Sequence, residues 1–205
     1  FSGPKPYTNL VDDIPKYCFF SKAALAALNY MDFIPDVIHC HDWQAGLIPI
    51  FQKTLFAGTP VGRAKTVLTI HNLRFQGIYN IPTIKYWTGL PEEAFDFGNL
   101  RYGDHDANMF KGGLAYADRI TTVSRTYSEE IQTWEYGENL DGHLRYHNQK
   151  LSGIVNGIDY GMWDPSSDPA VKFHYGIDDV IEKKAANKTA LQEELGLNTG
   201  ADKYM

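Results

Sequence analysis

Four short apolar runs, each followed closely by polar residues, alternate with longer segments that have helical spacing. Runs of this length, bounded by turn-forming residues, are typical of strands that a sheet buries, and we expect the first run to be buried on both faces. Strands that alternate with helices form parallel β-α-β units. We therefore expect an α/β fold, a Rossmann-like parallel sheet flanked by helices. The expected strands are residues 37–41, 66–71, 118–124 and 152–155.

Helical spacing is clear in residues 17–31, which carry apolar side chains every three or four positions and contain neither proline nor glycine. Asp42 and Ser124 each stand where the N-cap of a following helix is expected. Gly196 stands where a helix would end. The expected helices are residues 17–31, 43–56, 106–117, 126–134 and 178–195.

Two further regions lack regular spacing. Residues 72–101 combine prolines and glycines with aromatic residues, which indicates a long surface excursion with short helical turns. Residues 136–150 are polar, as in a linker, and residues 164–169 are rich in Asp, Pro and Ser. We expect an incomplete domain at 1–163, followed at 164–205 by an interdomain linker and a first helix towards a second domain.

Composition excludes several classes of protein. The chain has 19 Lys and Arg residues against 25 Asp and Glu, a formal net charge of −6, so no nucleic-acid partner is expected. No apolar run approaches the ~20 residues of a membrane helix, and the first six residues do not resemble a secretory leader. Cys18 and Cys40 fall in an expected helix and strand, which favours free core thiols in a reducing compartment.

Polar residues stand at all four expected strand ends. In an open parallel sheet, ligands bind beyond the carboxyl ends of the strands, because loops and helix N-termini converge there. His41 and His71, at successive strand ends, are therefore expected to face one cleft. The four ends are His41-Asp42, His71-Asn72, Ser124 and Asn156-Gly157.

The segment from His39 to Asp42 has the His-x-His spacing that many metal hydrolases use. Two histidines at this spacing in a strand point to the same face, and His71 and Asp42 are the candidates to complete a zinc site. No further pattern of metal ligands is evident. A metal-dependent hydrolase that uses His39, His41 and Asp42 therefore stands beside the simpler interpretation, in which His39 packs in the core and His41 ends its strand.

Other catalytic motifs do not occur in the sequence. Ser124 lies in Val-Ser-Arg, without the glycines of a nucleophile elbow. Lys111-Gly112-Gly113 falls within an expected helix and lacks the ending of a phosphate-binding loop, so close helix packing explains the two glycines better. No dinucleotide fingerprint is present, and hydride transfer is unsupported.

Six ordered segments, spanning about residues 17–197, resemble bacterial glycogen synthases and plant starch synthases. This resemblance implies a GT-B architecture of two Rossmann-like domains with a cleft between them. It also implies transfer of glucose, with retention, from ADP-glucose to an α-1,4-glucan, with no metal or other cofactor. The segments are 19–25 (FFSKAAL), 41–47 (HDWQAGL), 69–77 (TIHNLRFQG), 116–124 (YADRITTVS), 151–159 (LSGIVNGID) and 187–197 (NKTALQEELGL).

The resemblance also implies roles for individual residues. His71 would contact the transferred glucose and present its main-chain carbonyl near the anomeric carbon, and Asp42 would order the sugar or acceptor side of the cleft. Asn156 would reach the donor near the hinge. The catalytic candidates are thus His71 and Asp42, and the substrate-binding candidates are Asn156, Asn72, Gln76, Gly77 and His41.

Each role has a purely structural alternative. Asp42 would only cap a helix, His71 would only pack at a strand end, and Asn156-Gly157 would only form a tight turn. Aromatic residues near these loops are candidates for stacking on sugar rings, but such residues more often serve packing. They are Trp43, Tyr79 and Trp87.

Parts of the family pattern are not found in this sequence. The Lys-x-Gly-Gly loop would lie before Phe1, the basic residues for the diphosphate would lie after Met205, and Arg125 replaces a proline usual in the family. We therefore expect an inactive fragment of a larger enzyme of the bacterial cytoplasm, or of the plastid stroma in a plant. A non-catalytic carbohydrate-binding piece is a further alternative. Because the leading strands would be missing, the sheet would have an uncovered edge, and we expect the isolated fragment to self-associate.

Overall fold

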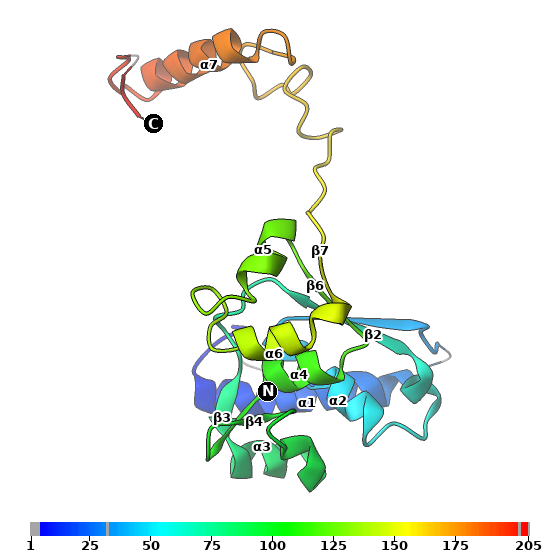
Figure 1. Ribbon diagram of the computed structural model, residues 1–205. Coiled ribbons are helices and arrows are strands. Elements are labelled where there is room, and N and C mark those ends of the chain that lie inside the picture. The colour runs from blue at the N-terminus through cyan, green and yellow to red at the C-terminus, as the bar shows by residue number, and fades with distance from the viewer. Residues whose placement is uncertain (1–4, 32, 201, 205) are drawn as a thin grey trace. The chain divides into compact units, whose positions relative to one another are not determined.

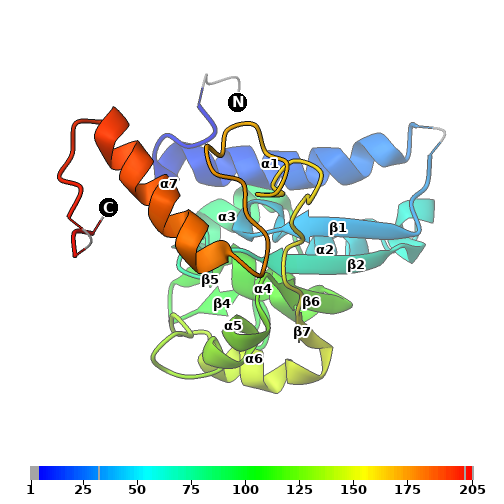
Figure 2. The same cartoon turned by 90° about the horizontal axis from the view of Figure 1, so that it is seen from above.

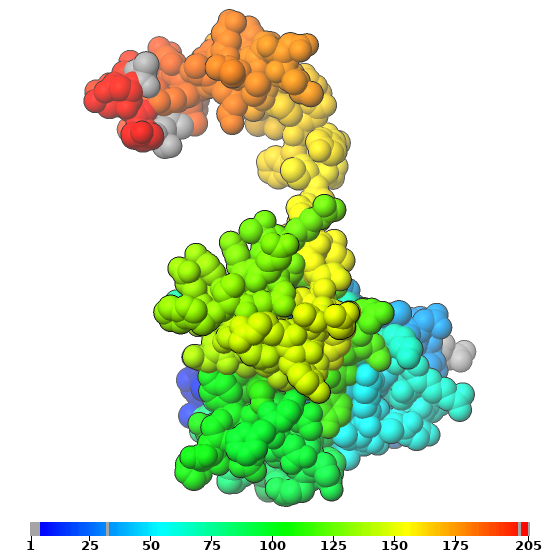
Figure 3. Space-filling model, in the orientation of Figure 1, coloured from blue at the N-terminus to red at the C-terminus, as the bar shows by residue number. Residues whose placement is uncertain are grey.

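The computed structural model describes residues 5–31, 33–200 and 202–204, so the first four residues, in which no leader is expected, lie outside the description. The chain forms two compact units, which divide between Asn156 and Gly157. In the space-filling view the colour follows residue number, from blue at the start of the first unit to red at the end of the second (Figure 3). This division falls slightly before the boundary expected after residue 163.

A parallel four-stranded sheet forms the centre of the first unit, as the sequence predicts. Its strands lie in the order β1-β2-β6-β7. All three pairings are parallel, with Cys40 opposite Leu68 and Thr69 opposite Thr121. Figure 1 shows α1, α2 and α4 together on one side of this sheet. The strands are β1 (Val37–His41), β2 (Lys65–Ile70), β6 (Arg119–Thr122) and β7 (Leu151–Gly153), and the three helices are α1 (Leu10–Leu28), α2 (Ile48–Lys53) and α4 (Met109–Tyr116).

Strand β1 lies at one end of the described sheet, and the expectation that both of its faces are buried is wrong. Only Cys40 of its five residues is buried, and Val37 is 52% exposed. A strand with one neighbour keeps an open edge, where backbone groups and flanking side chains remain in contact with solvent. An apolar run thus marks this strand correctly but does not reveal its place in the sheet.

The helices that flank β1 differ in length from those predicted. Helix α1 begins seven residues before position 17, because Asn9 caps it by accepting a hydrogen bond from the backbone N–H of Asp12 at 3.0 Å. The helix expected at 43–56 divides into a short 3-10 turn, Trp43–Ala45, and α2, with Gly46 and Leu47 between them.

The expected surface excursion at 72–101 contains much of a second, antiparallel sheet. Glycine and proline mark turns between short strands here as well as loops, so composition alone hides this sheet. Asn80 caps α3 and Asn108 caps α4, which explains why the helix predicted from residue 106 begins only at Met109. The sheet order is β3-β5-β4, formed by β3 (Ile78–Asn80), β5 (Asp106–Asn108) and β4 (Arg101–Tyr102), with α3 at Ile81–Thr88.

Capping residues and buried side chains also account for where the later helices begin and end. Ser124 caps α5 (Arg125–Glu130), as predicted, although the helix is shorter than expected. The expected linker at 136–150 contains α6 (Asp141–Tyr146). Leu140, which precedes this helix, and Leu144, which lies within it, are both buried. In the second unit, α7 (Val180–Glu194) confirms the predicted helix, and Gly196 follows it with a φ of +66°.

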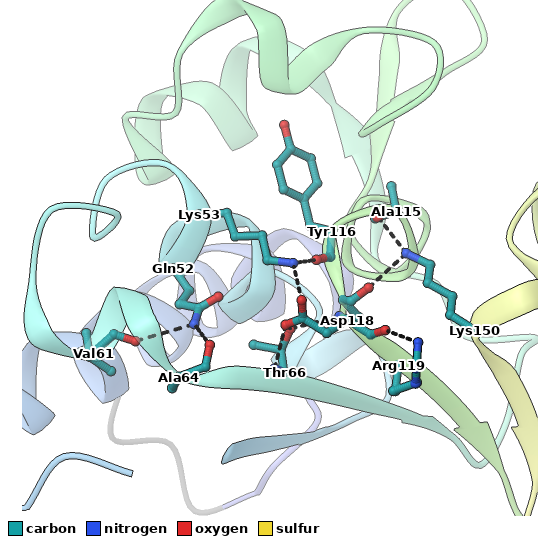
Figure 4. A network of polar contacts seen from close by, with 11 residues as sticks. Gln52, Lys53, Val61, Ala64, Thr66, Ala115, Tyr116, Asp118, Arg119 and Lys150 are labelled. Atoms are coloured by element: carbon teal, nitrogen blue, oxygen red, sulfur yellow. Dashed lines mark hydrogen bonds and ion pairs between the residues drawn. The ribbon is translucent and has the colours of Figure 1, made fainter. Parts of the chain in front are cut away.

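A polar network ties α4 to the start of β6 (Figure 4). The ammonium group of Lys53 donates to the Asp118 carboxylate at 3.0 Å and to the carbonyl of Tyr116 at 2.6 Å. The backbone N–H of Thr66 donates to the same carboxylate at 2.8 Å, and Lys150 donates to two carbonyls at the end of α4. Burial alone would raise the pKa of Asp118, but these hydrogen bonds hold it below its usual value.

Gly113 lets α4 pack closely against Gly46, just before α2, and the close packing predicted for Gly112-Gly113 is confirmed. A Cβ on Gly113 would lie 2.5 Å from the carbonyl oxygen of Gly46, so the two backbones are in contact there.

Cys18 and Cys40 are free and buried, and burial raises the pKa of each thiol to about 12. None of the helices in the described ranges is long and apolar enough to cross a membrane.

Two histidines on and after α6 give the first unit a pH-dependent stability. The rings of His143 and His147 lie 4.6 Å apart, and His143 Nε2 lies 3.1 Å from the carbonyl of Lys111. Burial lowers the pKa of His143 to about 3 and that of His147 to about 4. Between these values and about pH 6.5 the unfolded chain binds more protons than the folded chain, so stability falls as the pH falls.

We expect urea unfolding at pH 5 to show a loss of up to about 2 kcal/mol per histidine relative to pH 7. The variant His143→Gln keeps a hydrogen-bond donor near the Nε2 position but cannot titrate, so it should lose less stability over the same interval. An equal loss in both proteins would contradict this assignment.

Candidate functional site

Three histidine rings stand in a row at the carboxyl edge of the main sheet. The ring centroids of His39 and His41 lie 4.3 Å apart, and those of His41 and His71 lie 5.2 Å apart. Nδ1 of His41 lies 3.0 Å from Nε2 of His71, within hydrogen-bond distance. His41 and His71, expected at successive strand ends, are thus in direct contact, and that they face one cleft stays a prediction.

The carboxylate of Asp42 holds the chain where β2 ends. Its Oδ1 accepts hydrogen bonds from the backbone N–H groups of His71 at 2.8 Å and Asn72 at 3.3 Å. It makes no side-chain cap bond to the 3-10 turn that follows, so the expected N-cap role is wrong. The carboxylate is engaged across the sheet edge instead, and it joins two strand ends.

Asp42 also has an unusual backbone conformation, with φ 54° and ψ −169°. This region is occupied almost only by glycine, and another residue there costs on the order of 1–3 kcal/mol. Residues held in such conformations cluster at functional sites, because the surrounding structure must maintain them. The strain at Asp42 is therefore an observation that favours a functional role over a purely structural one.

A cavity of about 490 Å³ opens beside these strand ends. Aromatic and polar side chains line it together, as is usual in pockets that bind small molecules. Of the predicted residues, Asp42, Asn72 and the stacking candidate Trp43 line it, whereas His41 and His71 are not among its lining residues. The lining residues are Tyr7, Leu10, Asp13, Asp42, Trp43, Gln44, Asn72 and Phe75.

Gln76, a substrate-binding candidate in the sequence, has all its polar side-chain atoms engaged inside the protein. Its Nε2 donates to the carbonyls of Leu73 at 3.0 Å and Glu138 at 2.9 Å, and its Oε1 accepts from Asn108 Nδ2 at 2.5 Å. Only 6% of Gln76 is exposed. In this geometry Gln76 connects the loop that follows β2 to Glu138 and Asn108.

Gly77 approaches Trp43 so closely that no side chain fits. Its φ is +62°, and a Cβ there would lie 2.3 Å from the Trp43 ring. Trp43 is buried and packs edge-on against Tyr17, with ring centroids 4.9 Å apart. The expected stacking face of Trp43 is thus used largely for packing, and Tyr79 is also packed against the core.

Asn156 is exposed and follows β7, at the end of the first unit. No contact joins it to His71 or Asp42 in the described residues, so its role near a donor stays a prediction. Trp87, the third aromatic candidate, lies in α3 and is 40% exposed.

Sequence reasoning missed several residues of this site. Tyr7 and Phe75 line the cavity, and Gln44 contacts the hydroxyl of Tyr7. Tyr127 Oη accepts from the backbone N–H of Leu73, at 3.4 Å. Tyr7 and Tyr127 reach the site from distant parts of the chain, and no local spacing signals that. Gln44 and Phe75 lie within two of the segments that resemble the family, and this position was the signal that could have found them.

The histidine row does not make a metal centre. His39 Nε2 lies 2.7 Å from Thr69 Oγ1, so this ring nitrogen is engaged within the sheet. His39 is nevertheless exposed, and the expectation that it packs in the core is wrong, because β1 lies at the edge of the described sheet. Over the residues that the structure describes, no three His, Cys, Asp or Glu side chains are grouped so that they could hold a metal ion. The geometry does not favour the hydrolase interpretation.

The fold and the site together define the class. A Rossmann-like parallel sheet carries its polar groups at the carboxyl ends of neighbouring strands, beside an aromatic-lined cavity, as in enzymes that bind a ligand at such an edge. Residues 1–146 match the model of the family described as starch synthase catalytic domain. The chain belongs to this family.

Individual relatives agree with this assignment. The chain is 51% identical over its whole length to a protein of Lachnospira eligens named glycogen synthase, and it spans 43% of that protein. It is 45% identical over 87% of its length to the glycogen synthase of Thermotoga maritima, of which it covers 36%. The chain therefore spans less than half the length of these relatives.

A solved structure is also similar. It is the catalytic domain of starch synthase IV from Arabidopsis thaliana, bound to ADP and acarbose. The match has a TM-score of 0.78 and 34% sequence identity, and it covers 96% of this chain and 40% of the other. This similarity confirms the predicted fold class over nearly all of the chain.

Proposed function

We propose that this chain supplies part of the active site of a retaining glucosyltransferase, a glycogen or starch synthase. The enzyme moves glucose from ADP-glucose to the non-reducing end of an α-1,4-glucan. The observation that carries the proposal is the joint placement of Asp42, His41 and His71 at one sheet edge, in a chain of the starch synthase family. The ADP and acarbose in the similar Arabidopsis structure support a nucleotide donor and a glucan-like acceptor.

The proposed reaction requires rigid hydrogen-bonding groups rather than a strong nucleophile. The donor separates into a diphosphate and an oxocarbenium-like sugar, so the site must orient the sugar and stabilise the charges that develop. Asp42 fixes the backbone at His71, and His71 then offers its ring and carbonyl to the sugar. Asn72 and the neighbouring cavity wall provide the acceptor side.

The remaining parts of the site come from outside this chain in our proposal. The chain covers 43% of the Lachnospira relative, so groups for the diphosphate and base would be supplied by the rest of the enzyme. We propose that residues 1–163 form part of the first Rossmann-like domain. Residues 164–205, with α7, would form the linker and first helix of the second. Asn156, at the division of the two units, would then reach the donor near the hinge. The isolated chain would be inactive.

We place the enzyme in the cytoplasm, because the glycogen synthases reported above come from bacteria. Glucan and nucleotide sugar are its proposed partners, without a metal cofactor. A carbohydrate-binding piece without transfer chemistry is the second candidate, and the aromatic-lined cavity is the observation in its favour.

A chimera tests the proposal. This chain would replace the matching residues of the Lachnospira eligens glycogen synthase, to which it is 51% identical. We expect the chimera to transfer labelled glucose from ADP-glucose to glycogen in the presence of EDTA, and the variant His71→Ala to lose this activity. A folded chimera that binds glucan without transfer would favour the binding-piece alternative.

We also propose that the isolated chain self-associates through the open edge of β1. Val37 in this strand is 52% exposed, and Phe33 and Ile34 just before it are 59% and 45% exposed. An unpaired strand edge flanked by apolar side chains favours pairing with a second copy. Light scattering after size exclusion should show a dimer or larger species, whereas a stable monomer at high concentration would contradict this proposal.

A further inference from the structure

The contact between His41 and His71 points to a role for His41 that its position in the sequence does not reveal. We infer that His41 is a positioning residue, which holds the His71 ring in one orientation and couples the tautomer of His71 to its own through the bond between Nδ1 of His41 and Nε2 of His71. That this orientation serves the reaction rests on the proposed function of His71. That His41 orients the His71 ring does not depend on the proposed function.

His41 is itself held by the sheet. It is the last residue of β1, opposite Thr69 of β2, and its ring lies 4.3 Å from that of His39 at an angle of 32°. His39 contacts Thr69 Oγ1 at 2.7 Å, and Thr69 Oγ1 lies 2.6 Å from Thr121 Oγ1. A continuous row of side chains across three strands therefore supports the ring that contacts His71.

The chemistry of two facing imidazole nitrogens restricts both rings. One nitrogen must carry the hydrogen and the other must offer a lone pair, so the contact is lost when both are protonated. The pKa of His41 is lowered by loss of hydration and by the neighbouring His39 and His71, which favours its neutral form. Nδ1 of His71 then remains available for a ligand, since within the described residues the His71 ring bonds only to His41.

His71 is thereby fixed at two points. Asp42 holds its backbone N–H at 2.8 Å, and His41 holds its ring at 3.0 Å. A side chain that is held at its backbone and at its ring loses little freedom when substrate binds, and a catalytic group needs such placement. Removing His41 should free the ring while the backbone anchor remains.

The isolated chain, labelled with ¹⁵N, allows a direct test by long-range NMR correlations of the histidine ring nitrogens at pH 7. In the wild-type chain we expect a scalar coupling across the hydrogen bond between Nδ1 of His41 and Nε2 of His71, with nitrogen shifts of the two rings that depend on each other. In His41→Ala we expect the His71 nitrogen shifts to move to those of a ring that exchanges freely between its tautomers. The variant His41→Asn, whose amide lies near the position of Nδ1, should return the His71 shifts towards their wild-type values, but His41→Gln should not. His174→Gln, in the second unit, is the control that leaves His71 unchanged.

Unchanged His71 nitrogens in His41→Ala, with backbone amide signals that show an intact fold, would overturn the inference. In the chimera we expect His41→Ala to lower kcat about 10- to 100-fold with KM for ADP-glucose within about twofold, and His41→Asn to recover most of kcat. A wild-type kcat in His41→Ala would also overturn the positioning role. A chimera inactive without any substitution would count against the proposed function alone, and the NMR result would still decide the placement of His71.

Discussion

Replacing Gly113 by alanine is expected to destabilise the fold by about 3 kcal/mol or more. The new Cβ would lie 2.5 Å from the carbonyl oxygen and 2.9 Å from the Cα of Gly46, and both are backbone atoms that cannot move away alone. Gly46 has no room for a side chain either, since a Cβ there would lie 2.7 Å from the carbonyl oxygen of Met109, the first residue of α4. Helix α4 would have to shift against the segment before α2.

Two other glycines provide matched controls for urea unfolding. A Cβ on Gly98 meets nothing within 4 Å, so Gly98→Ala should leave stability nearly unchanged. A Cβ on Gly112 would meet side-chain atoms of Leu100 at 2.6 Å and Ile50 at 2.8 Å rather than backbone, so Gly112→Ala should cost less than Gly113→Ala. Equal stability of the Gly113→Ala and Gly98→Ala chains would show that the backbone contact is not as described.

Substitutions of Asp42 should separate the stability of the chain from the activity of the enzyme. Both Asp42→Gly and Asp42→Ala remove the carboxylate that fixes His71, and we expect each to lower glucose transfer by the chimera about 100-fold or more. Only glycine relieves the strain at φ 54° and ψ −169°. Asp42→Gly should therefore be more stable than Asp42→Ala by about 1–3 kcal/mol.

Urea unfolding of the two Asp42 variants measures this difference without any assay of function. If Asp42→Gly is no more stable than Asp42→Ala, the backbone at this position is not strained. If either variant transfers glucose at the wild-type rate, the carboxylate has no part in the reaction.

The sequence predicts the main sheet well because its strands are marked locally. Each is a short apolar run between turn residues, and parallel pairing follows from the helices between the runs. The second, antiparallel sheet is not marked in this way. Its strands have two or three residues, and only long-range pairing such as Tyr79 opposite Ala107 defines them.

The candidate site shows the same contrast. His41, Asp42 and His71 were predicted together because they follow neighbouring parallel strands, and strand ends meet at one edge. Their individual roles depend on geometry that no spacing specifies. Asp42 bonds across the sheet instead of capping a helix, and Gln76 faces inward to Asn108 because the loop after β2 folds over α4.

The central claim is that Asp42 and His71 act as one unit in sugar transfer, and a double-mutant cycle in the chimera measures this directly. The single variants His71→Ala and Asp42→Gly should each lower kcat for transfer from ADP-glucose about 100-fold, and the double variant should be little worse than either one. If the two losses multiply instead, to about 10,000-fold, the residues act independently and the account of a shared site is contradicted.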